Sequence, residues 1–369
     1  MKRKVLFFVN SLSGGGAEKV LQTLLQHLNM DKFEVTLYSL HKEDHNKGYP
    51  SSVTYRYLYG HGKIGDYIKT FIYKYFSPSL FYRLFVRGKY DAEVAFIEGY
   101  STRIVSGSTN KHSKKIAWVH IDLQNNHWTD IAFRSKEEEC ECYRRFDVVV
   151  GVSQTVKAVN DSLFIGLKSS IFIYNPVPAD EIKSLAALSP PYSVEWDCFV
   201  FVACGRLEKQ KGFDRLIDVA KQLLDEGYNF KVVIIGEGTE KHILEKRIKE
   251  KELDGCVDLV GYQTNPFPLL KHADCFVCSS RAEGFSLVVL EAMILGLPIV
   301  ATNCAGPNEL VGNSEYGLLV DNSVEGIYGG MKYMVDNIEK LEVYQRKSVE
   351  RVQNFDLQKI IYKIEEILL

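Results

Sequence analysis

The chain alternates short, wholly apolar runs with segments of helical periodicity, and no other feature constrains its fold as much. Residues 5–9 form the first apolar run; a glycine-rich turn follows, and residues 17–28 then carry apolar side chains at helical spacing. Later runs in this half lie at 33–40, 94–97, 115–119 and 146–152. Because an apolar run without polar alternation indicates a strand buried on both faces, we expect a parallel sheet with helices on each side.

The alternation stops near the middle of the chain and then restarts. Proline residues at 176, 178, 190 and 191 interrupt it, which indicates a hinge. Beyond them we predict strands over 198–204, 230–235, 257–260, 275–278 and 298–301, and helices over 212–224, 241–251 and 286–295. The 369 residues exceed what one hydrophobic core usually supports. The sequence therefore predicts two Rossmann-like, doubly wound α/β domains facing across a cleft, over 1–175 and 176–354, with a helix over 355–369 joining the first.

Composition excludes several classes of protein. A hydrophobic fraction of 46%, a charged fraction of 25% and a net charge of −2 favour neither disorder nor nucleic-acid binding. No apolar stretch approaches the roughly 18 residues of a spanning helix, and the first apolar run ends at Asn10, too early for an export signal. The eight cysteines are scattered, and we interpret the pair Cys275 and Cys278 as strand core. We expect a cytoplasmic protein whose membrane contact, if it has one, is peripheral.

Two cations follow the strand predicted over 198–204. Arg206 and Lys211 lie in the loop between this strand and the next helix, at the sheet edge where open α/β proteins bind ligands. Two cations beside a helix N-terminus suit a diphosphate, although a solvated basic loop is an open alternative.

A second loop carries two acidic residues. Glu283 precedes the helix predicted over 286–295, and Glu291 lies within it, so both side chains can reach one cleft. Gly284 allows a sharp turn, and the amides of residues 286–288 are free donors at the helix start. Carboxylates accept hydrogen bonds from vicinal hydroxyls, which sugars and ribose supply. The alternative for Glu291 is an ordinary surface glutamate.

These residues resemble a known family. Glu283 and Glu291 match the E-x7-E signature of the retaining GT-B glycosyltransferases of family GT4, and Arg206 and Lys211 match its phosphate-binding pair. Residues 13–18, Ser-Gly-Gly-Gly-Ala-Glu, resemble its glycine-rich first turn, and the similarity extends over nearly the whole chain. Residues 305–309 resemble its later glycine-proline-acid turn, with alanine at 305 where a second glycine is common.

The resemblance implies a GT-B fold and a role for each matched residue. Glu283 would hold hydroxyls of the donor sugar, Glu291 the ribose, and Arg206 and Lys211 the diphosphate, with the donor also contacting Gly284, Phe285, Ser286 and Leu287. Gly15 and Gly16 would let the backbone approach the phosphates closely. His120 matches the active-site histidine, for which a satisfied core histidine is the alternative. Gly236, Gly261 and Tyr262 match positions that cradle the base.

The resemblance also implies the reaction and its partners. The second domain would bind a nucleotide-sugar, with UDP favoured, as a co-substrate rather than a cofactor; the first would bind a saccharide acceptor, such as a polyprenyl-linked saccharide of bacterial capsule or O-antigen synthesis. Transfer would retain the anomeric configuration. No D-x-D occurs, so we expect no metal dependence. A nucleotide-sugar epimerase, a non-catalytic nucleotide-sugar sensor and a dinucleotide oxidoreductase are the alternatives; the last lacks G-x-G-x-x-G and an acid after its second strand.

One stretch suggests a membrane contact. Residues 67–89 interleave aromatic residues with Lys69, Lys74, Arg83, Arg87 and Lys89, and Asp66 is the acid that borders them. Basic residues attract anionic headgroups and aromatic residues settle at the bilayer interface. Pro78 divides the stretch into two short helices. The alternative is that the aromatic residues pack beneath the first sheet.

Overall fold

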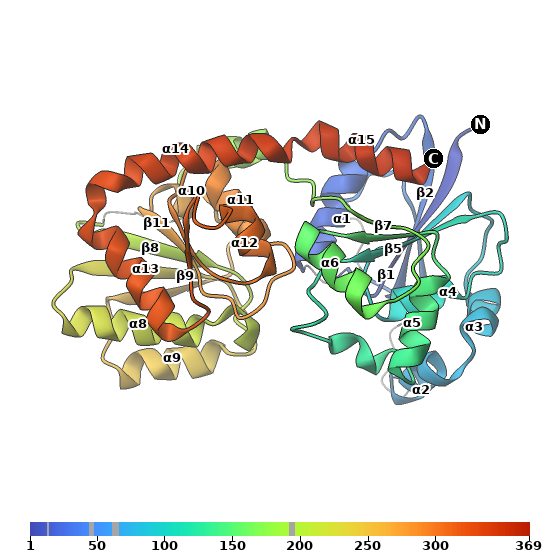
Figure 1. The fold of residues 1–369 in the computed structure, drawn as a ribbon, viewed down its shortest axis with the longest axis horizontal. Coiled ribbons are helices and arrows are strands. Elements are labelled where there is room, and N and C mark those ends of the chain that lie inside the picture. Colours follow the sequence, from blue (N-terminus) through green and yellow to red (C-terminus); the bar gives the residue numbers. More distant parts are fainter. Residues whose placement is uncertain (13–14, 44–47, 61–65, 192–195) are drawn as a thin grey trace. The chain divides into compact units, whose positions relative to one another are not determined.

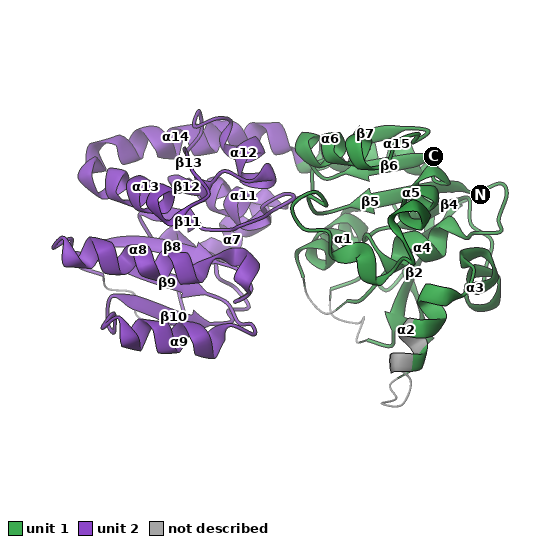
Figure 2. Cartoon of the chain, turned by 60° about the horizontal axis from the view of Figure 1, so that its bottom comes forward, with its two compact units in different colours: residues 1–176, 357–369 green, residues 177–356 purple. Residues whose placement is uncertain are grey.

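The computed structural model describes residues 1–12, 15–43, 48–60, 66–191 and 196–369, apart from the side chains of 66, 67, 69 and 70. Two compact units make up the chain. The first contains residues 1–176 and 357–369, and the second residues 177–356 (Figure 2).

Unit 1 is built on a seven-stranded sheet in which neighbouring strands pair in parallel, in the order β3-β2-β1-β4-β5-β6-β7 (Figure 1). Its strands are β1 (Arg3–Val9), β2 (Phe33–His41), β3 (Thr54–Tyr59), β4 (Ala92–Ala95), β5 (Lys114–Val119), β6 (Val148–Gly151) and β7 (Ser170–Phe172). The central strands are buried because their sequences are apolar on both faces, as in the run from Val5 to Val9.

Helices cover this sheet. They are α1 (Gly16–His27), α2 (Asp66–Tyr75), α3 (Pro78–Phe85), α4 (Tyr100–Ser106), α5 (Lys136–Arg144), α6 (Gln154–Leu163) and α15 (Leu357–Leu368). Helix α1 buries Val20, Leu21, Leu24 and Leu25, which share one face. Helix α15 belongs to unit 1, although it follows unit 2 in the chain. Its Glu365 accepts a hydrogen bond from the Asn29 amide (3.0 Å) and forms an ion pair with Lys32 (2.8 Å).

Unit 2 has the same architecture, with six strands in the order β10-β9-β8-β11-β12-β13, and its neighbouring strands also pair in parallel. Its strands are β8 (Phe199–Cys204), β9 (Phe230–Ile235), β10 (Val257–Gly261), β11 (Cys275–Cys278), β12 (Ile299–Thr302) and β13 (Leu318–Val320). Its helices are α7 (Ala179–Ala186), α8 (Phe213–Asp225), α9 (Lys241–Glu250), α10 (Phe267–Lys271), α11 (Leu287–Ile294), α12 (Ala305–Val311), α13 (Val324–Asp336) and α14 (Leu341–Val352).

The predicted fold class is confirmed in both units, since each is a doubly wound parallel sheet. Cys275 and Cys278 lie in β11 as buried free thiols, as the core-strand interpretation expected. Sequence analysis missed β3, β7 and β13, and it missed the helices between the predicted strands at 94–97, 115–119 and 146–152. In the described part of the chain, no helix has both the length and the hydropathy to cross a bilayer.

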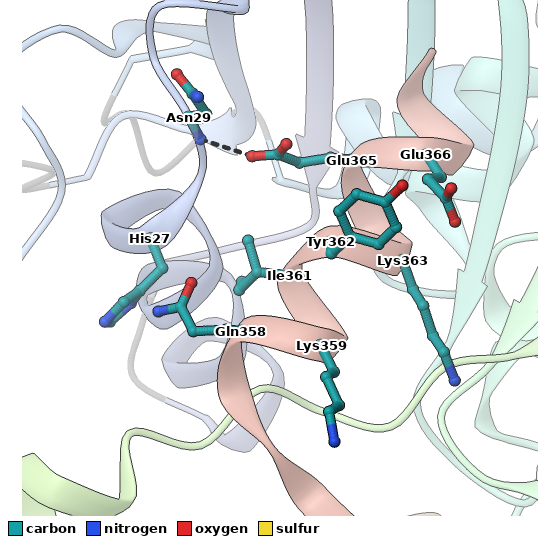
Figure 3. Close-up of a pocket in the computed structure, with 9 residues that line it drawn as sticks. All are labelled: His27, Asn29, Gln358, Lys359, Ile361, Tyr362, Lys363, Glu365 and Glu366. Carbon is teal, nitrogen blue, oxygen red and sulfur yellow. Dashed lines mark hydrogen bonds between the residues drawn. The ribbon is translucent and has the colours of Figure 1, made fainter.

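A hollow of about 860 Å³ lies on unit 1 between the end of α1 and helix α15 (Figure 3). His27 and Asn29 line it from one side, and residues of α15 from Gln358 to Glu366 line it from the other. Since α1 starts at the carboxyl end of β1, its last residues lie at the opposite edge of the sheet. This hollow is therefore remote from the edge where doubly wound sheets bind ligands.

Candidate active site

The strand order of unit 2 reverses between β8 and β11. From β8 the chain builds outward through β9 to β10, and from β11 it builds the other way through β12 to β13. Loops leaving two such strands diverge and leave a crevice at the carboxyl edge, where doubly wound sheets bind ligands. Arg206 and Lys211 follow β8, and Glu283 follows β11, so the fold brings the two predicted motifs to this one place.

Lys211 and Glu283 form an ion pair at this crevice. The Nζ atom of Lys211 lies 2.5 Å from Oε1 of Glu283, and both side chains are largely buried. Ser280 also donates its hydroxyl to Oε1 of Glu283, at 2.7 Å. Burial acts to lower the pKa of Lys211, but the Glu283 carboxylate outweighs it and raises the pKa above its usual value. Lys211 therefore keeps its positive charge in the crevice.

Arg281 fastens the two loops to each other. Its guanidinium binds both carboxylate oxygens of Asp214 in α8, at 2.8 and 2.7 Å, and also donates to the Lys209 carbonyl at 2.6 Å. Its own amide donates to the Gln210 carbonyl at 2.7 Å. Desolvation opposes ionisation of Asp214, yet the contact with Arg281 lowers the pKa of that carboxyl. A bidentate pair fixes geometry as well as charge, so this contact sets the spacing between Lys211 and Glu283.

Gly212 and Arg215 hold the start of α8 against the end of β11. Gly212 adopts a φ of +69°, and a Cβ there would overlap the Ser279 carbonyl oxygen. Arg215 donates to that same carbonyl and to Oδ1 of Asn322, the latter at 2.8 Å. The Ser279 hydroxyl in turn donates to the carbonyl of Lys211 at 2.9 Å. The backbone carrying Lys211 is thus fixed by contacts that leave its side chain directed to Glu283.

Helix α11 begins at the crevice without a side-chain cap. Ser286 is its N-cap residue and makes no capping bond, and its Oγ is buried without a hydrogen-bond partner among the described residues. A helix start leaves amide donors for an anion or an oxygen-rich ligand. A buried, unpartnered hydroxyl beside such donors favours a site that a polar ligand completes.

Gly306 lets the next helix approach this loop. Its amide donates to the Glu283 carbonyl at 2.9 Å, and a Cβ would lie 2.7 Å from Cα of Phe285 and 2.8 Å from the Ser286 amide nitrogen. Any side chain here would displace the loop that carries Glu283. Alanine at position 305, where a second glycine is common, does not disturb this contact, because Gly306 is the residue that lies close to the loop.

The other predicted donor residues lie around the same edge. Glu291 is on α11 and 4% exposed, which removes the surface-glutamate alternative. Gly284 and Phe285 are buried between Glu283 and α11. Arg206 is 61% exposed in its side chain and lies 3.3 Å from Glu208. Unlike Lys211, Arg206 has solvent around it.

The two glycines predicted to border the base lie at the carboxyl ends of β9 and β10. Gly236 has a φ of +150°, its amide donates to the Gly261 carbonyl at 2.9 Å, and a Cβ on it would overlap the Gly205 carbonyl oxygen. Gly261 adopts a φ of +75°. Tyr262 is 71% exposed, so its ring lies open at this edge.

In unit 1, Gly15 is the N-cap residue of α1 and Gly16 is its first residue. Ser13 and Gly14 of the predicted glycine-rich turn lie outside the described residues. A Cβ at Gly15 would press on the Glu18 carboxylate. The turn places both glycines at the carboxyl end of β1.

His120 follows β5, and its ring nitrogen Nε2 is buried without a hydrogen-bond partner among the residues described. Burial lowers the pKa of His120 to about 4, against a hydrogen bond to the Phe96 backbone that raises it. The imidazole is therefore neutral at neutral pH. Phe96 also contacts it, with ring centroids 4.9 Å apart.

Other polar residues near His120 have structural partners. Asp122, a weakly supported nucleophile candidate, accepts from the Gln124 amide at 2.9 Å and from the Asn125 side chain at 2.7 Å. His127 lies 2.8 Å from Glu139, and Asp130 completes a set of ligand-type atoms within 4.8 Å of one another. Glu139 already accepts from Thr129 at 2.7 Å as well as contacting His127, so this set fastens a loop.

Comparison with known proteins decides the family of unit 2. Residues 195–351 match the family model described as glycosyl transferases group 1. The second unit belongs to the glycosyl transferases group 1. That match covers the Lys211–Glu283 crevice, α11 and the Gly306 contact.

Two curated relatives extend the match into unit 1. An uncharacterized glycosyltransferase of Methanocaldococcus jannaschii is 32% identical over 253 residues, which cover 59% of this chain and 62% of the relative. The N-acetylgalactosamine-N,N'-diacetylbacillosaminyl-diphospho-undecaprenol 4-alpha-N-acetylgalactosaminyltransferase of Campylobacter jejuni is 26% identical over 366 residues, 97% of each chain.

Solved structures match over both units of this chain. The Anabaena protein HepE in complex with UDP and glucose aligns with a TM-score of 0.75 and 19% identity over 99% of each chain. Sucrose-phosphate synthase of Thermosynechococcus elongatus aligns with a TM-score of 0.80 and 16% identity, over 99% of this chain and 98% of its own. The predicted GT-B fold class is thereby confirmed.

Sequence analysis of this group 1 unit found the two loops but missed the residues that hold them together. Arg281 lies just before Glu283 in the sequence and had no assigned role, and Asp214, Arg215 and Asn322 belonged to no recognised motif. Their signal is tertiary, since Arg281 and Asp214 are 67 positions apart. The roles of the predicted site residues stay predictions.

Proposed function

We propose that this chain is a retaining, metal-independent hexosyltransferase that moves a sugar from a UDP-sugar to a hydroxyl of a lipid-linked saccharide. The observation that carries the proposal is the buried Lys211–Glu283 pair beside the open start of α11 at the switch point of unit 2. It places a fixed positive charge, a carboxylate and free amide donors within one crevice. Those are the groups that a sugar diphosphate needs.

In this proposal the catalytic contribution is electrostatic. Lys211 and Arg206 face the diphosphate and stabilise the charge that develops as it departs. The amides at the start of α11, with the hydroxyl of Ser286, add donors, and Glu283 accepts from sugar hydroxyls. The departing phosphate oxygen takes the proton of the acceptor hydroxyl, which attacks the anomeric carbon from the face that the phosphate leaves. Configuration is thereby retained.

The remaining predicted residues complete the donor site. Glu291 accepts from the ribose, and Gly236, Gly261 and Tyr262 border the base. Gly15, Gly16 and His120 belong to unit 1, which supplies the acceptor site. The neutral imidazole expected for His120 suits a hydrogen bond to a sugar hydroxyl without adding charge. No cofactor enters the proposal.

The acceptor class draws support from the relatives. The Campylobacter jejuni relative, aligned over 97% of both chains, is named for transfer to a diphospho-undecaprenol saccharide. Others are named for amylovoran synthesis in Erwinia amylovora and O-antigen synthesis in Escherichia coli. We extend this to a bacterial envelope polysaccharide, with the chain acting at the cytoplasmic face.

Product analysis by mass spectrometry tests the proposed function. Purified protein is incubated with a panel of UDP-sugars and polyprenyl-linked saccharides. A transferase adds the mass of one sugar to the acceptor and releases UDP. Isomerisation of the donor without an acceptor would identify an epimerase, and binding without any product would indicate a sensor.

Peripheral membrane contact is the second part of the proposal, and helices α2 and α3 carry it. They lie side by side at the outer edge of unit 1 in both views (Figures 1 and 2). Their apolar side chains divide into two sets. Tyr73, Phe81 and Tyr82 are buried, so these aromatic side chains of the predicted stretch do not face a bilayer. Exposed instead are Ile68, Phe71, Tyr75, Phe76, Leu80 and Leu84.

The positive charge of the surface formed by α2 and α3 favours an anionic bilayer as its partner. Arg83, Arg87 and Lys89 are exposed beside the apolar residues, and no acid occurs from 67 to 90. Phe71 and Tyr75 have ring centroids 4.5 Å apart and form one aromatic patch. Apolar side chains at the interface and cations at the headgroups together favour such a membrane.

Liposome co-sedimentation tests the contact. Binding to vesicles of phosphatidylcholine and phosphatidylglycerol in equal parts should exceed binding to phosphatidylcholine alone, and it should fall with salt. Phe71→Ser with Leu84→Ser should weaken it, as should replacing Arg83, Arg87 and Lys89 by glutamine. Ile243→Ser in α9 is the control, because Ile243 is similarly exposed but lies in unit 2. Equal recovery with both vesicle types at low salt would remove the membrane contact.

A further inference from the structure

Unit 1 has its own switch point, and a buried carboxylate lies there. Its strand order reverses between β1 and β4. Asn10 follows β1, and Glu98 follows β4 with 4% exposure. The mechanism proposed above does not use Glu98.

Each carboxylate oxygen of Glu98 accepts a hydrogen bond from a different segment. Oε2 accepts from the backbone amide of His120, at 2.9 Å, and Oε1 accepts from Nε1 of Trp128, at 3.2 Å. His120 directly follows β5, and Trp128 begins the short 3-10 helix Trp128–Ile131. The carboxylate thus joins three separate parts of the carboxyl edge of the sheet.

The turn that carries Glu98 is itself fixed. The Asn10 side chain donates to the Glu98 carbonyl at 3.0 Å, and its oxygen accepts from the amide and hydroxyl of Ser101 at 2.9 and 2.6 Å. Gly99 has a φ of +87°, and a Cβ there would lie 3.1 Å from the Trp128 ring. Since backbone and carboxylate are held independently, Glu98 cannot move without moving His120 and Trp128.

What this arrangement leaves open is one atom of His120. Its Nε2 is buried and unpartnered among the described residues, while its backbone amide is held by Glu98. A buried polar atom without a partner indicates a group that the structure does not contain. Nε2 of the neutral His120 imidazole is therefore available to a ligand.

We infer that Glu98 is a positioning residue for sugar transfer, holding His120 and Trp128 so that Nε2 of His120 meets a hydroxyl of the reacting sugars. The inference rests on the proposed function. A carboxylate is needed because each of its two oxygens accepts from a different N–H. In a glutamine amide, a donating nitrogen replaces one of these oxygens, so one N–H would face another donor.

Steady-state kinetics of Glu98→Gln test this role. We expect kcat to fall roughly 10- to 100-fold with little change in KM for the donor, because displacement of a positioned group slows chemistry more than binding. Glu93→Gln is the matched control. Glu93 is a fully buried carboxyl in β4, the strand that Glu98 follows, and it accepts from Tyr82 at 3.0 Å. It should lose stability without a comparable loss of kcat.

A double variant distinguishes loss of positioning from a nonspecific loss of activity. In Glu98→Gln combined with Trp128→Phe, the indole donor is gone, so the amide oxygen can serve the His120 N–H alone. We expect the double variant to recover part of the kcat lost by Glu98→Gln. Purely additive losses would overturn the inference, as would a Glu98→Gln enzyme with the parent's kcat.

Two further outcomes keep the test decisive. Where Glu98→Gln does not fold, Trp128→Phe alone removes one of the two donors, and an unchanged kcat for it overturns the inference. A parent protein that transfers no sugar removes the proposed function and the inference together. A parent that transfers sugar beside a fully active Glu98→Gln removes only the positioning role.

Discussion

The ammonium group of Lys211 lies 2.5 Å from the carboxylate of Glu283, so the cation assigned to the diphosphate and the acid assigned to the sugar form one unit. Their effects on transfer should therefore be coupled. We expect Lys211→Ala to lower turnover by on the order of 100-fold, about 3 kcal/mol of lost charge stabilisation. In a double-mutant cycle, Lys211→Ala with Glu283→Gln should cost less than the sum of the two single losses. Additive losses would contradict the coupling, and normal kinetics in folded Lys211→Ala would remove the phosphate assignment.

Substitutions of Glu283 and Glu291 should affect different ligands. Glu283→Gln should reduce transfer from the UDP-sugar while leaving the affinity for free UDP nearly intact, because Glu283 is assigned to the sugar. Glu291→Gln should weaken free UDP itself, since its partner is the ribose. Isothermal titration with UDP, beside initial rates with the UDP-sugar, measures both. Two variants that bind UDP like the parent would refute the ribose role.

His120 makes stability depend on pH in a defined direction. Its pKa is lowered from 6.5 to about 4 in the fold, so the unfolded chain binds the proton more readily than the folded one. Between these values, the free energy of unfolding should fall as pH falls, by on the order of 3 kcal/mol across the window. Chemical denaturation from pH 7 to pH 4 measures it, with His120→Gln as the control that loses this component. The same pH slope in both proteins would be evidence against the burial of the imidazole.

Arg103 holds the end of α2, one of the two helices assigned to the membrane contact, so its removal should be costly. It is buried in α4, forms an ion pair with Glu138 at 2.9 Å, and donates to carbonyls at the end of α2, including Lys74 and Phe76 at 2.8 Å each. Removing one partner of a buried pair costs roughly 3–5 kcal/mol. Arg103→Met should lower the melting temperature and speed amide exchange in α2 first. Unchanged exchange there would show that the helix is held by other contacts.

The sequence predicted the interior of both sheets but, of the edge strands that the structure describes, it predicted β10 and missed the others. Strands such as β1 and β8 are buried on both faces, so their apolar runs are visible in the sequence. The missed strands β3, β7 and β13 each lie at the edge of a sheet, where partly exposed residues replace that run. Edge strands need fewer apolar residues because one side faces solvent or a loop.

The candidate site shows the same division. Lys211 and Glu283 belong to local motifs, and the sequence predicted their place at the carboxyl edge. The contacts that set their separation, such as Arg281 with Asp214 and Gly306 with Phe285, join residues distant in the chain. The positioning role of Glu98 was missed for the same reason, since its partners His120 and Trp128 come 22 and 30 positions later in the chain.

The anomeric configuration of the product tests the central claim most directly. A UDP-sugar of known configuration is converted with its acceptor, UDP release is measured, and the new linkage is assigned by proton NMR. The account predicts one UDP released for each sugar transferred, with the donor's configuration kept in the product. An inverted linkage, or UDP-sugar consumed without any gain by the acceptor, would contradict it.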